Sequence, residues 1–377
     1  MGTAATFSVS AVGTGLTYQW RKDGVNIVGV NNASYTIAAT VANDAGVYSV
    51  IVTSTCSPND TSGNAVLVID PKPSAIMGTP SVNATFTTTL TNVVPGGKWS
   101  SSDTTIAKVD STTGVVTGVL FGTAIISYTV NNACGVITVK KDFTVIRNTV
   151  KVSLKVFLQG PYNPNSGFMD ATLRVNGFLP SVEPYTGMSN FIHKGSGGGE
   201  LFDNPAVSTI IGNNAIVDWV FIELRDKATP SKVVATRSAL LQRDGDIVDT
   251  DGTSALTIND VIVGDYYIAV RHRNHLGFRT ATPQSLTTTS LSLNLSDGST
   301  ALFGSTPLKL IGSVYVMYSG NGDGNGAVNA IDKNSIWLKT NGQFNYLRGD
   351  FNLDGAVNAV DINEHWRLNN SKVQQLD

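Results

Sequence analysis

The feature that most restricts how this chain can fold is a twelve-residue pattern that occurs twice near its C-terminal end. The copies cover residues 321–332 and 350–361 and lie 29 residues apart. Each has an oxygen-bearing side chain at positions 1, 3, 5, 9 and 12 and glycine at position 6. Such spacing supplies the oxygen ligands that a hard cation prefers, and the glycine permits the sharp turn. The pattern therefore predicts two calcium loops.

We expect one calcium ion in each loop, bound by side-chain oxygens and by the backbone carbonyl of position 7. The candidate ligands are Asn321, Asp323, Asn325, Ala327, Asn329 and Asp332 in the first loop, and Asp350, Asn352, Asp354, Ala356, Asn358 and Asp361 in the second. Because the second loop has more carboxylates, it should bind its ion more tightly. The alternative is a pair of turns that bind nothing, since Asn, Asp and Gly also favour turns. Turn chemistry alone, however, does not require a duplicated oxygen register.

The match between the two copies extends beyond the loops. Gly320 corresponds to Gly349, and Trp337 to Trp366. Apolar residues follow each loop at roughly helical spacing, and they are Ile331, Ile336 and Trp337 in the first copy and Val360, Ile362 and Trp366 in the second. A duplicated loop with Asp at position 12 and one following helix resembles the dockerin family over residues 320–371.

The resemblance implies docking onto cohesin modules, partly through the residue pair before the last loop Asp. These pairs are Ala330-Ile331 and Ala359-Val360, which are apolar where Ser-Thr is often seen.

Composition favours a modular, mainly β protein. The length of 377 residues suggests two to four domains, and the low charged fraction of 14% favours strands and turns. A net charge of −2 gives no field that attracts nucleic acid or an anionic membrane. The sequence contains neither an apolar run long enough for membrane insertion nor a signal peptide. We therefore expect a fragment of a longer secreted protein.

Residues 1–70 are expected to form an Ig-like domain. Short alternating strands are predicted at residues 5–12, 16–21, 34–37, 47–53 and 65–69. Trp20 and the run Asp44-Ala-Gly-Val-Tyr48 resemble the core Trp and the tyrosine corner of an Ig-like sandwich, with Val9 and Val50 at the usual cysteine positions. The first strand is apparently missing. The exposed edge results either from truncation or from completion by a neighbouring subunit through strand addition, which would build a fibre.

Residues 71–147 are expected to form a second β domain. The run Trp99-Ser-Ser-Ser-Asp103 and the segments 107–109, 114–118 and 122–127 together resemble the bacterial Ig-like group 2 domain. That resemblance implies a spacer or adhesive module. Cys56 and Cys134 fall in different predicted domains, so an intradomain disulfide is not expected.

Residues 148–312 are expected to form a larger β-sandwich with insertions. Strands are predicted at residues 154–158, 217–224, 232–241 and 266–272. The run Gly264-Asp-Tyr-Tyr-Ile-Ala-Val270 resembles the closing strand of a transthyretin-like or CnaB-like sandwich. Residues 313–377 are expected to form the dockerin-like module. Trp20, Trp99 and Trp219 occupy core-like strand positions.

Two charged clusters in this third region offer other chemistry. Asp244, Asp246, Asp249 and Asp251 suggest a third calcium loop or a general acid/base pair, although a hairpin with two Asp-Gly turns fits the spacing better. His272 and His275 would point to opposite faces of a strand, which favours a solvated strand end over a zinc site. The basic run 271–279 is expected to be an exposed face, or else a grip for an acidic partner or glycan.

The sequence as a whole predicts a non-enzymatic structural or adhesive protein of the bacterial cell surface, stabilised by two calcium ions. The expected partners are a protein or a second copy of the chain, with a cohesin-like or glycan ligand as further possibilities and no nucleic acid. One alternative is a dockerin-bearing accessory or carbohydrate-binding component of a polysaccharide-degrading complex. Another is an enzyme that combines the Asp244 to Asp251 cluster with His272, which requires these groups to share one pocket.

Overall fold

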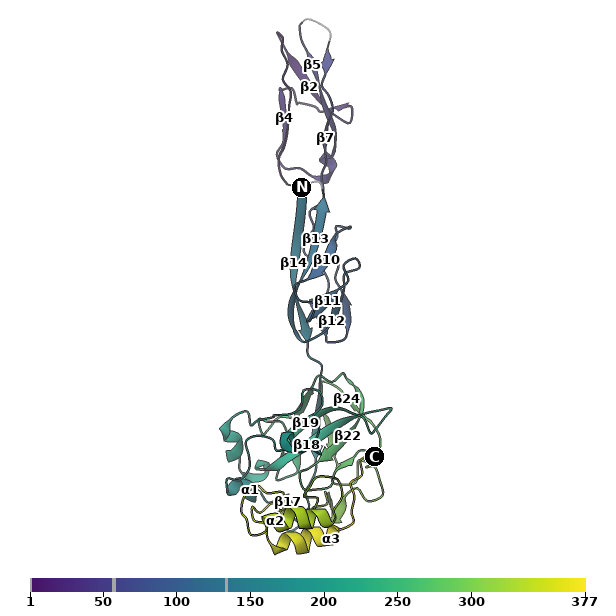
Figure 1. Ribbon diagram of the computed structural model, residues 1–377. Helices are drawn as coiled ribbons and strands as arrows, with labels where there is room; N and C mark the ends of the chain where they lie inside the picture. The colour runs from purple at the N-terminus through teal and green to yellow at the C-terminus, as the bar shows by residue number, and fades with distance from the viewer. Residues whose placement is uncertain (1, 56–58, 133–134) are drawn as a thin grey trace. The chain divides into compact units, whose positions relative to one another are not determined.

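The computed structural model describes residues 2–55, 59–132 and 135–377. Cys56 and Cys134 lie outside the described residues, so the expectation about their pairing stays a prediction. The chain is mainly β and divides into two compact units, Met1–Arg147 and Asn148–Asp377. Figure 1 shows the arrows that predominate in both units and the few short helices of the second. In the described part of the chain, no helix is long and apolar enough to cross a membrane.

The first domain is an Ig-like sandwich of two sheets. Its strands are β1 (Ala5–Ser8), β2 (Thr17–Lys22), β3 (Val25–Asn26), β4 (Ser34–Ile37), β5 (Gly46–Thr53), β6 (Asp60–Thr61) and β7 (Ala65–Leu67), with a short 3-10 helix η1 (Ala42–Asp44). β1 pairs with β4 in one sheet, and β3, β2, β5 and β6 follow one another in the other, with β7 also on β5. Among the described strands, neither β1 nor β4 has a second neighbour in their sheet, and the missing first strand stays a prediction.

The core of this domain is built on the residues that the sequence singled out. Trp20 and Tyr48 are buried, and the Phe7 ring stacks on Tyr48 with centroids 4.4 Å apart. The hydroxyl of Tyr48 donates to the carbonyl of Asp44 at 2.7 Å, which makes the predicted tyrosine corner. This hydrogen bond fixes the connection between η1 and β5.

The rest of the first unit, from β8 onward, contains two further β-sheets. Its strands are β8 (Ser81–Asn83), β9 (Thr87–Thr89), β10 (Lys98–Ser101), β11 (Ala107–Val109), β12 (Val115–Gly118), β13 (Gly122–Asn132) and β14 (Gly135–Ile146). One sheet has the order β10-β13-β14-β8 and the other β11-β12-β9. Trp99 is buried between them, with its ring 4.6 Å from that of Tyr128. The boundary predicted at residue 70 stays a prediction.

The second unit is organised around a nine-stranded sheet. Its strands are β15 (Thr149–Lys155), β18 (Ile216–Asp226), β19 (Val233–Gln242), β20 (Asp246–Val248), β21 (Leu256–Asn259), β22 (Gly264–Arg271), β23 (Phe278–Arg279), β24 (Gln284–Leu286) and β25 (Leu291–Asn294). Their order is β21-β15-β20-β19-β18-β22-β23, with β24 on β22 and β25 on β15.

Strand β18 is buried on both faces, which explains its nearly continuous apolar sequence. Trp219 and Phe221 belong to one hydrophobic cluster, and Val220 and Ile222 belong to another on the opposite face. Residues of the insertion 179–210 cover the first cluster, and residues of the C-terminal region such as Met317 and Leu353 belong to the second. The alternation of these residues follows from the two-residue period of a strand.

Smaller elements surround this sheet. They are β16 (Tyr162–Asn163), β17 (Phe168–Met169), α1 (Thr172–Val175), η2 (Tyr185–Gly187), η3 (Pro205–Thr209), η4 (Gly212–Asn214), β26 (Lys309–Ile311) and β27 (Val314–Val316). Each repeat then ends in one continuous helix, composed of η5 (Asp332–Trp337) and α2 (Leu338–Thr340), or of η6 (Asp361–Trp366) and α3 (Arg367–Asn369). Figure 1 shows α2 (yellow-green) and α3 (yellow) next to each other at the edge of this unit.

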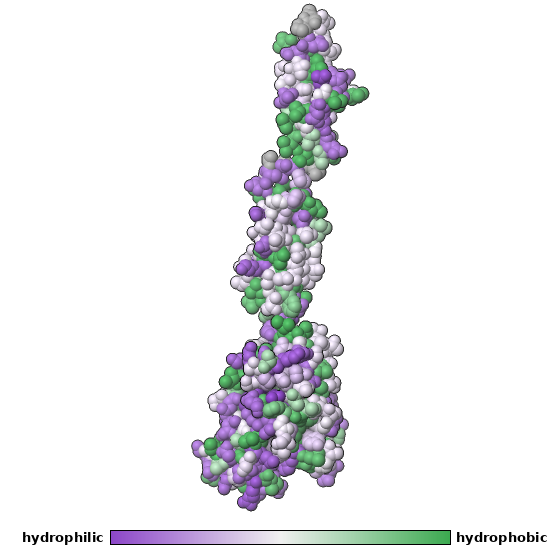
Figure 2. Space-filling model, turned by 90° about the vertical axis from the view of Figure 1, so that its right-hand side faces the viewer, coloured by the Kyte–Doolittle hydropathy of each residue, from purple (hydrophilic) through white to green (hydrophobic). Residues whose placement is uncertain are grey.

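The repeats share a core with the sheet. Leu353 of the second loop and Met317 before the first loop belong to the main hydrophobic cluster of the sheet. The division predicted at residue 312 stays a prediction, and the two parts it would separate are joined by a buried interface. Figure 2 shows hydrophobic side chains (green) on the visible face of this unit lying among hydrophilic ones (purple).

Removing the corner hydroxyl by Tyr48→Phe should destabilise the first domain by about 0.5–1.5 kcal/mol, the usual net contribution of one hydrogen bond. Hydrogen exchange of the β2 and β5 amides in the whole chain measures this locally. The control is Tyr18→Phe on β2, which removes a hydroxyl outside the corner. Equal effects of the two changes would contradict a specific role for the corner.

Candidate metal centre

The two loops fold alike because the same positions make the same hydrogen bonds. At position 6, the amide of Gly326 donates to Asn321 Oδ1 at 3.2 Å, and that of Gly355 donates to Asp350 Oδ2 at 2.8 Å. Both glycines have positive φ, 92° and 88°, which other residues adopt only with strain. The first side chain of each loop is thereby drawn across the turn. The predicted role of glycine at position 6 agrees with this geometry.

Position 4 has a left-handed backbone in both loops but carries glycine in only one of them. The first loop has Gly324 there, whereas the second has Leu353 with φ 60°, in the left-handed region that costs a non-glycine residue about 1 kcal/mol or more. Leu353 is 1% exposed and packs into the core of the sheet. Burial of a leucine contributes about 1.5–3 kcal/mol, which offsets this strain.

Position 12 closes each loop from the other side. Asp332 accepts hydrogen bonds from the amides of Asp323 at 3.1 Å and Asn329 at 2.8 Å. Asp361 accepts in the same way from Asn352 at 3.2 Å and Asn358 at 2.8 Å. Both aspartates are fully buried. Their carboxylates therefore face the loop interior rather than solvent.

The asparagines at position 9 have a role besides the predicted one as ligands. Asn329 Oδ1 accepts from the amide of Ile331 at 2.8 Å, and Asn358 Oδ1 accepts from that of Val360 at 2.8 Å. Each asparagine thus caps the helix that follows, and the aspartate three residues later binds its amide in return. The asparagine at position 9 and the aspartate three residues later form a capping-box pattern that can be recognised in the sequence. Direct metal ligation by these two side chains would compete with the cap.

The remaining candidate ligands line the loops less deeply. Asp323, Asn352 and Asp354 are half-buried, and Asn325 is exposed. At position 7 the backbone carbonyls of Ala327 and Ala356 accept only long hydrogen bonds. The donors are the side-chain Nδ2 atoms of the position 9 asparagines, at 3.3 and 3.4 Å. These carbonyls therefore keep capacity to bind a cation.

The carboxylates of both loops are held in an environment that disfavours their charge. Burial raises the pKa of Asp350 to about 7, assisted by Asp361 and Asp354 and opposed by Arg273. Burial likewise raises the pKa of Asp361 to about 6 and that of Asp332 to about 6, with the neighbouring Asp354 and Asp323 adding repulsion. A divalent cation would relieve both the burial cost and the repulsion.

The donor set fits calcium, although the protein groups do not form a ready-made cluster. Across residues 2–55, 59–132 and 135–377, no three or more His, Cys, Asp or Glu side chains group as they would around a metal ion. Amide and backbone oxygens would have to complete each shell, as they do in calcium loops generally. All of these donors are oxygen atoms, which excludes a preference for soft metals.

The residues shared by the two repeats outside the loops join one repeat to the other. Trp337 Nε1 donates to the carbonyl of Asn358 at 2.9 Å, and Trp366 Nε1 donates to that of Asn329 at 2.8 Å. A Cβ at Gly320 would lie 3.1 Å from the Cα of Trp366. Each tryptophan therefore forms a hydrogen bond to the other repeat, and the glycine allows the two repeats to approach closely. Of the predicted apolar residues, however, Ile331 and Val360 are exposed.

The basic run 271–279 was wrongly predicted to be an exposed face. His272, Arg273 and His275 are at most 1% exposed, and Arg279 is 5% exposed. Strand β22 ends at Arg271, so the two histidines lie in the following turn rather than on a strand. The prediction failed because a run of charges does not reveal a partner that lies far away in the sequence.

The partner of this run is Asp218 on β18. Its carboxylate accepts from Arg273 Nε at 3.0 Å and from the hydroxyl of Tyr346 at 2.5 Å. Tyr346 lies in the segment that connects the two repeats. Burial alone would raise the pKa of Asp218, but Arg273 and His272 outweigh it and lower the pKa to about 2. The ion pair is thus maintained in the interior of the unit.

The histidines continue this network as neutral groups. Burial lowers the pKa of both His272 and His275. The amide of Gly160 donates to His275 Nε2 at 3.2 Å, so the proton of His275 is assigned to Nδ1, which faces His272 Nδ1 at 3.1 Å. His272 Nε2 then donates to Asp218 at 3.1 Å. The two Nδ1 atoms thus face each other within hydrogen-bonding distance, and among the described residues no third His, Cys, Asp or Glu joins them as a zinc site would need.

The Asp244 to Asp251 cluster forms turns, as the preferred interpretation predicted. Gly245 and Gly252 both have positive φ and follow Asp244 and Asp251. Asp249 pairs with Arg237 at 2.8 Å, and Asp246 pairs with Lys155 at 2.9 Å. A cavity of 620 Å³ includes Asp249 and Asp251 in its lining but not His272, which is fully buried elsewhere. The alternative enzyme hypothesis required these groups to meet, and they do not.

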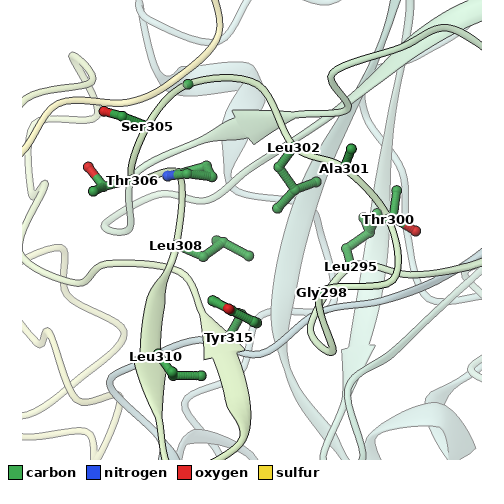
Figure 3. A pocket seen from close by; sticks show the side chains of 12 residues that line it. Leu295, Gly298, Thr300, Ala301, Leu302, Ser305, Thr306, Leu308, Leu310 and Tyr315 are labelled. Carbon is green, nitrogen blue, oxygen red and sulfur yellow. The ribbon is translucent and has the colours of Figure 1, made fainter.

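A second cavity, of 430 Å³, lies beside the hairpin β26–β27. Figure 3 shows that Leu308, Leu310 and Tyr315 of the hairpin region line it together with Leu302 from the preceding loop. None of the candidate calcium ligands contributes to its lining. The cavity is therefore not part of the candidate metal centre.

Comparison with known proteins gives only weak likenesses. No family model and no curated protein matches the chain. Similar solved structures include an amphioxus IgVJ-C2 molecule, with 17% identity and a TM-score of 0.26 over 38% of this chain and 97% of that chain. The insect immune protein hemolin shows 16% identity and a TM-score of 0.26, over 38% of this chain and 42% of that chain. A C-terminal fragment of intimin shows 12% identity and a TM-score of 0.24, over 68% and 92%.

The topology itself defines the class. Two sheets that enclose a buried tryptophan and a tyrosine corner make the N-terminal domain Ig-like. The chain is thus a mainly β, Ig-like protein with a pair of loop-helix repeats packed on its C-terminal sheet.

Asp218→Asn should destabilise the second unit by about 3–5 kcal/mol at pH 7, because it leaves Arg273 buried without a counter-charge. The folded pKa of about 2 lies below the ordinary value of about 3.9. Asp218 therefore contributes its stability above about pH 4 and loses it as the pH falls toward 2, and the variant should lack this loss. Urea denaturation from pH 2 to 7 measures both effects. Asp218→Asn with Arg273→Met should cost less than the sum of the single changes.

Proposed function

We propose that this protein is a non-enzymatic, extracellular structural or adhesive protein whose C-terminal unit is stabilised by two calcium ions. The observation that supports calcium most directly is the burial of Asp332, Asp350 and Asp361 in two matching loops. Three buried carboxylates without cationic partners inside their loops are costly, and a calcium ion in each loop removes that cost.

The finer assignment follows the resemblances of the sequence. The two N-terminal domains act as spacers, the second of them as a bacterial Ig-like group 2 module. The large sheet corresponds to a transthyretin-like or CnaB-like domain, and the repeats correspond to a dockerin-like module. Such a modular chain suits the bacterial cell surface, where millimolar calcium is compatible with extracellular sites whose dissociation constants are about 0.1–1 mM.

The chain's own residues would hold calcium in defined roles. The side chains of positions 1, 3, 5 and 12 and the carbonyl of position 7 would supply ligands, while position 9 caps the helix. Calcium would add charge neutralisation and hold the loop entry and the helix start together. At a hundredfold excess over the dissociation constant, each ion would contribute about 2.7 kcal/mol of stability.

Calorimetric titration of the chain should show two calcium ions bound, with the second loop the tighter site. Asp350→Ala with Asp361→Ala should abolish the tighter event, and chelation should lower the melting temperature of the unmodified chain. The matched pair Asn321→Ala with Asp332→Ala should abolish the weaker event instead. Absence of binding at millimolar calcium would overturn this proposal.

A second candidate function is attachment to a cohesin-like partner, as part of a polysaccharide-degrading complex. The exposure of Ile331 at 51% and Val360 at 38% favours it, because these residues stand at equivalent places on the two helices. Solvent-facing apolar residues on rigid helices are suited to docking.

Ile331→Ser with Val360→Ser should weaken binding to immobilised cohesin modules at least about tenfold, as expected for the loss of two apolar anchors. Surface plasmon resonance in millimolar calcium measures this. Leu338→Ser is the control, because Leu338 is also exposed on the first helix. If the unmodified chain binds no cohesin module at micromolar concentration, this second function is excluded.

A further inference from the structure

The buried turn after β22, residues 272–277, lies between the entries to both loops. On one side the amide of Leu276 donates to the carbonyl of Tyr318 at 2.8 Å, two residues before Gly320. On the other side Arg273 Nη1 donates to the carbonyl of Leu347 at 2.6 Å, three residues before Asp350. The turn therefore contacts the chain just upstream of each position 1.

Asn274 at the centre of this turn contacts the first residue of both loops. Its carbonyl accepts from the amides of Gly320 and Asn321, both at 3.0 Å. Its side-chain Nδ2 donates to the carbonyl of Asp350 at 2.6 Å. Asn274 is fully buried. One residue of the sheet unit thus holds the starting points of two loops that lie 29 residues apart.

The orientation of the Asn274 amide is determined by its neighbours. Oδ1 lies 2.8 Å from His275 Nδ1, the nitrogen assigned the proton, because Nε2 accepts from the amide of Gly160. This leaves Nδ2 as the atom that faces Asp350. Gly160 is fitted closely here, since a Cβ on it would lie 2.1 Å from the carbonyl oxygen of Phe351. The neutral imidazole therefore acts as a support for the asparagine.

We propose that Asn274 is a positioning residue that places the first ligand of both calcium loops and couples calcium binding at one loop to binding at the other. This inference rests on the proposed calcium function and deepens it. An ion that orders either loop entry orders the turn, and the ordered turn then presents the other entry already in place. The conformational entropy of the turn is lost when the first ion binds and is not lost again when the second binds, which makes binding cooperative.

The two halves of this contact can be separated by mutation. Asn274 holds the first loop through its backbone carbonyl and the second loop through its side chain. Asn274→Ala therefore removes the link to Asp350 and keeps the link to Asn321. We expect affinity at the second loop to fall about tenfold, which corresponds to one buried hydrogen bond, while the first loop keeps the affinity that it has when the second loop is empty. Cooperativity between the sites should disappear.

A measurement on the unmodified chain tests the coupling without any variant. Hydrogen exchange of residues 272–277 should slow when calcium is added, although none of these residues is a candidate ligand. The calcium titration of the same sample should be cooperative. If two ions bind independently and exchange in the turn does not change, the coupling is overturned while the calcium function stands. If no ion binds, both are overturned.

The matched control is Asn176→Ala. Asn176 Nδ2 donates to the carbonyl of Asp354 in the second loop at 3.4 Å, from outside the turn and without contact to the first loop. This change should leave cooperativity and the calcium-dependent protection of residues 272–277 intact. Equal loss of cooperativity in both variants would overturn the assignment to Asn274. Asn274→Asp, which places an oxygen against the Asp350 carbonyl, should weaken the second site more than Asn274→Ala does.

Discussion

The C-terminal unit depends on one carboxylate and one guanidinium that are buried together. Asp218 belongs to the centre of the sheet, and Arg273 belongs to the turn that receives the loop-helix repeats. A buried ion pair gives little net stability, because desolvation opposes the attraction. What it provides is a defined arrangement, since Tyr346 and His272 donate to the same carboxylate only when the sheet and the repeats are correctly docked. The loops are therefore formed on a rigid support.

Much of the scaffold was predictable from sequence because its signals are local or periodic. Trp20, Trp99 and Trp219 are buried as expected from their strand positions. Strand β4 has the predicted bounds, and β5 begins one residue before the predicted start. The register of the loops could also be recognised in the sequence. Ordinary turns do not require glycine at position 6 and oxygen-bearing side chains at fixed spacing in two copies. Calcium itself remains a proposal that rests on this register and on buried carboxylates.

The interface could not be predicted, because its partners are far apart in the sequence. Arg273 bonds Asp218, 55 residues earlier, and Asn274 bonds Asp350, 76 residues later. The composition of the run 271–279 fits an exposed basic face as well as a buried network, so composition does not distinguish the two. The helix caps at Asn329 and Asn358 were missed for a different reason: we assigned these residues a single role as ligands. The aspartate three residues after each asparagine was a local sign of a capping box.

Leu353 gives the second repeat a property that the first lacks. Its side chain belongs to the core of the sheet while its backbone lies within the loop, in a conformation that a free chain seldom adopts. The shape of that loop consequently depends on its contact with the sheet of the same unit. If residues 313–377 were transplanted onto another protein, the candidate ligands would be kept but the contact that holds the second loop in its conformation would be lost. Leu353 would then be exposed to solvent. The portable unit is the sheet together with its repeats.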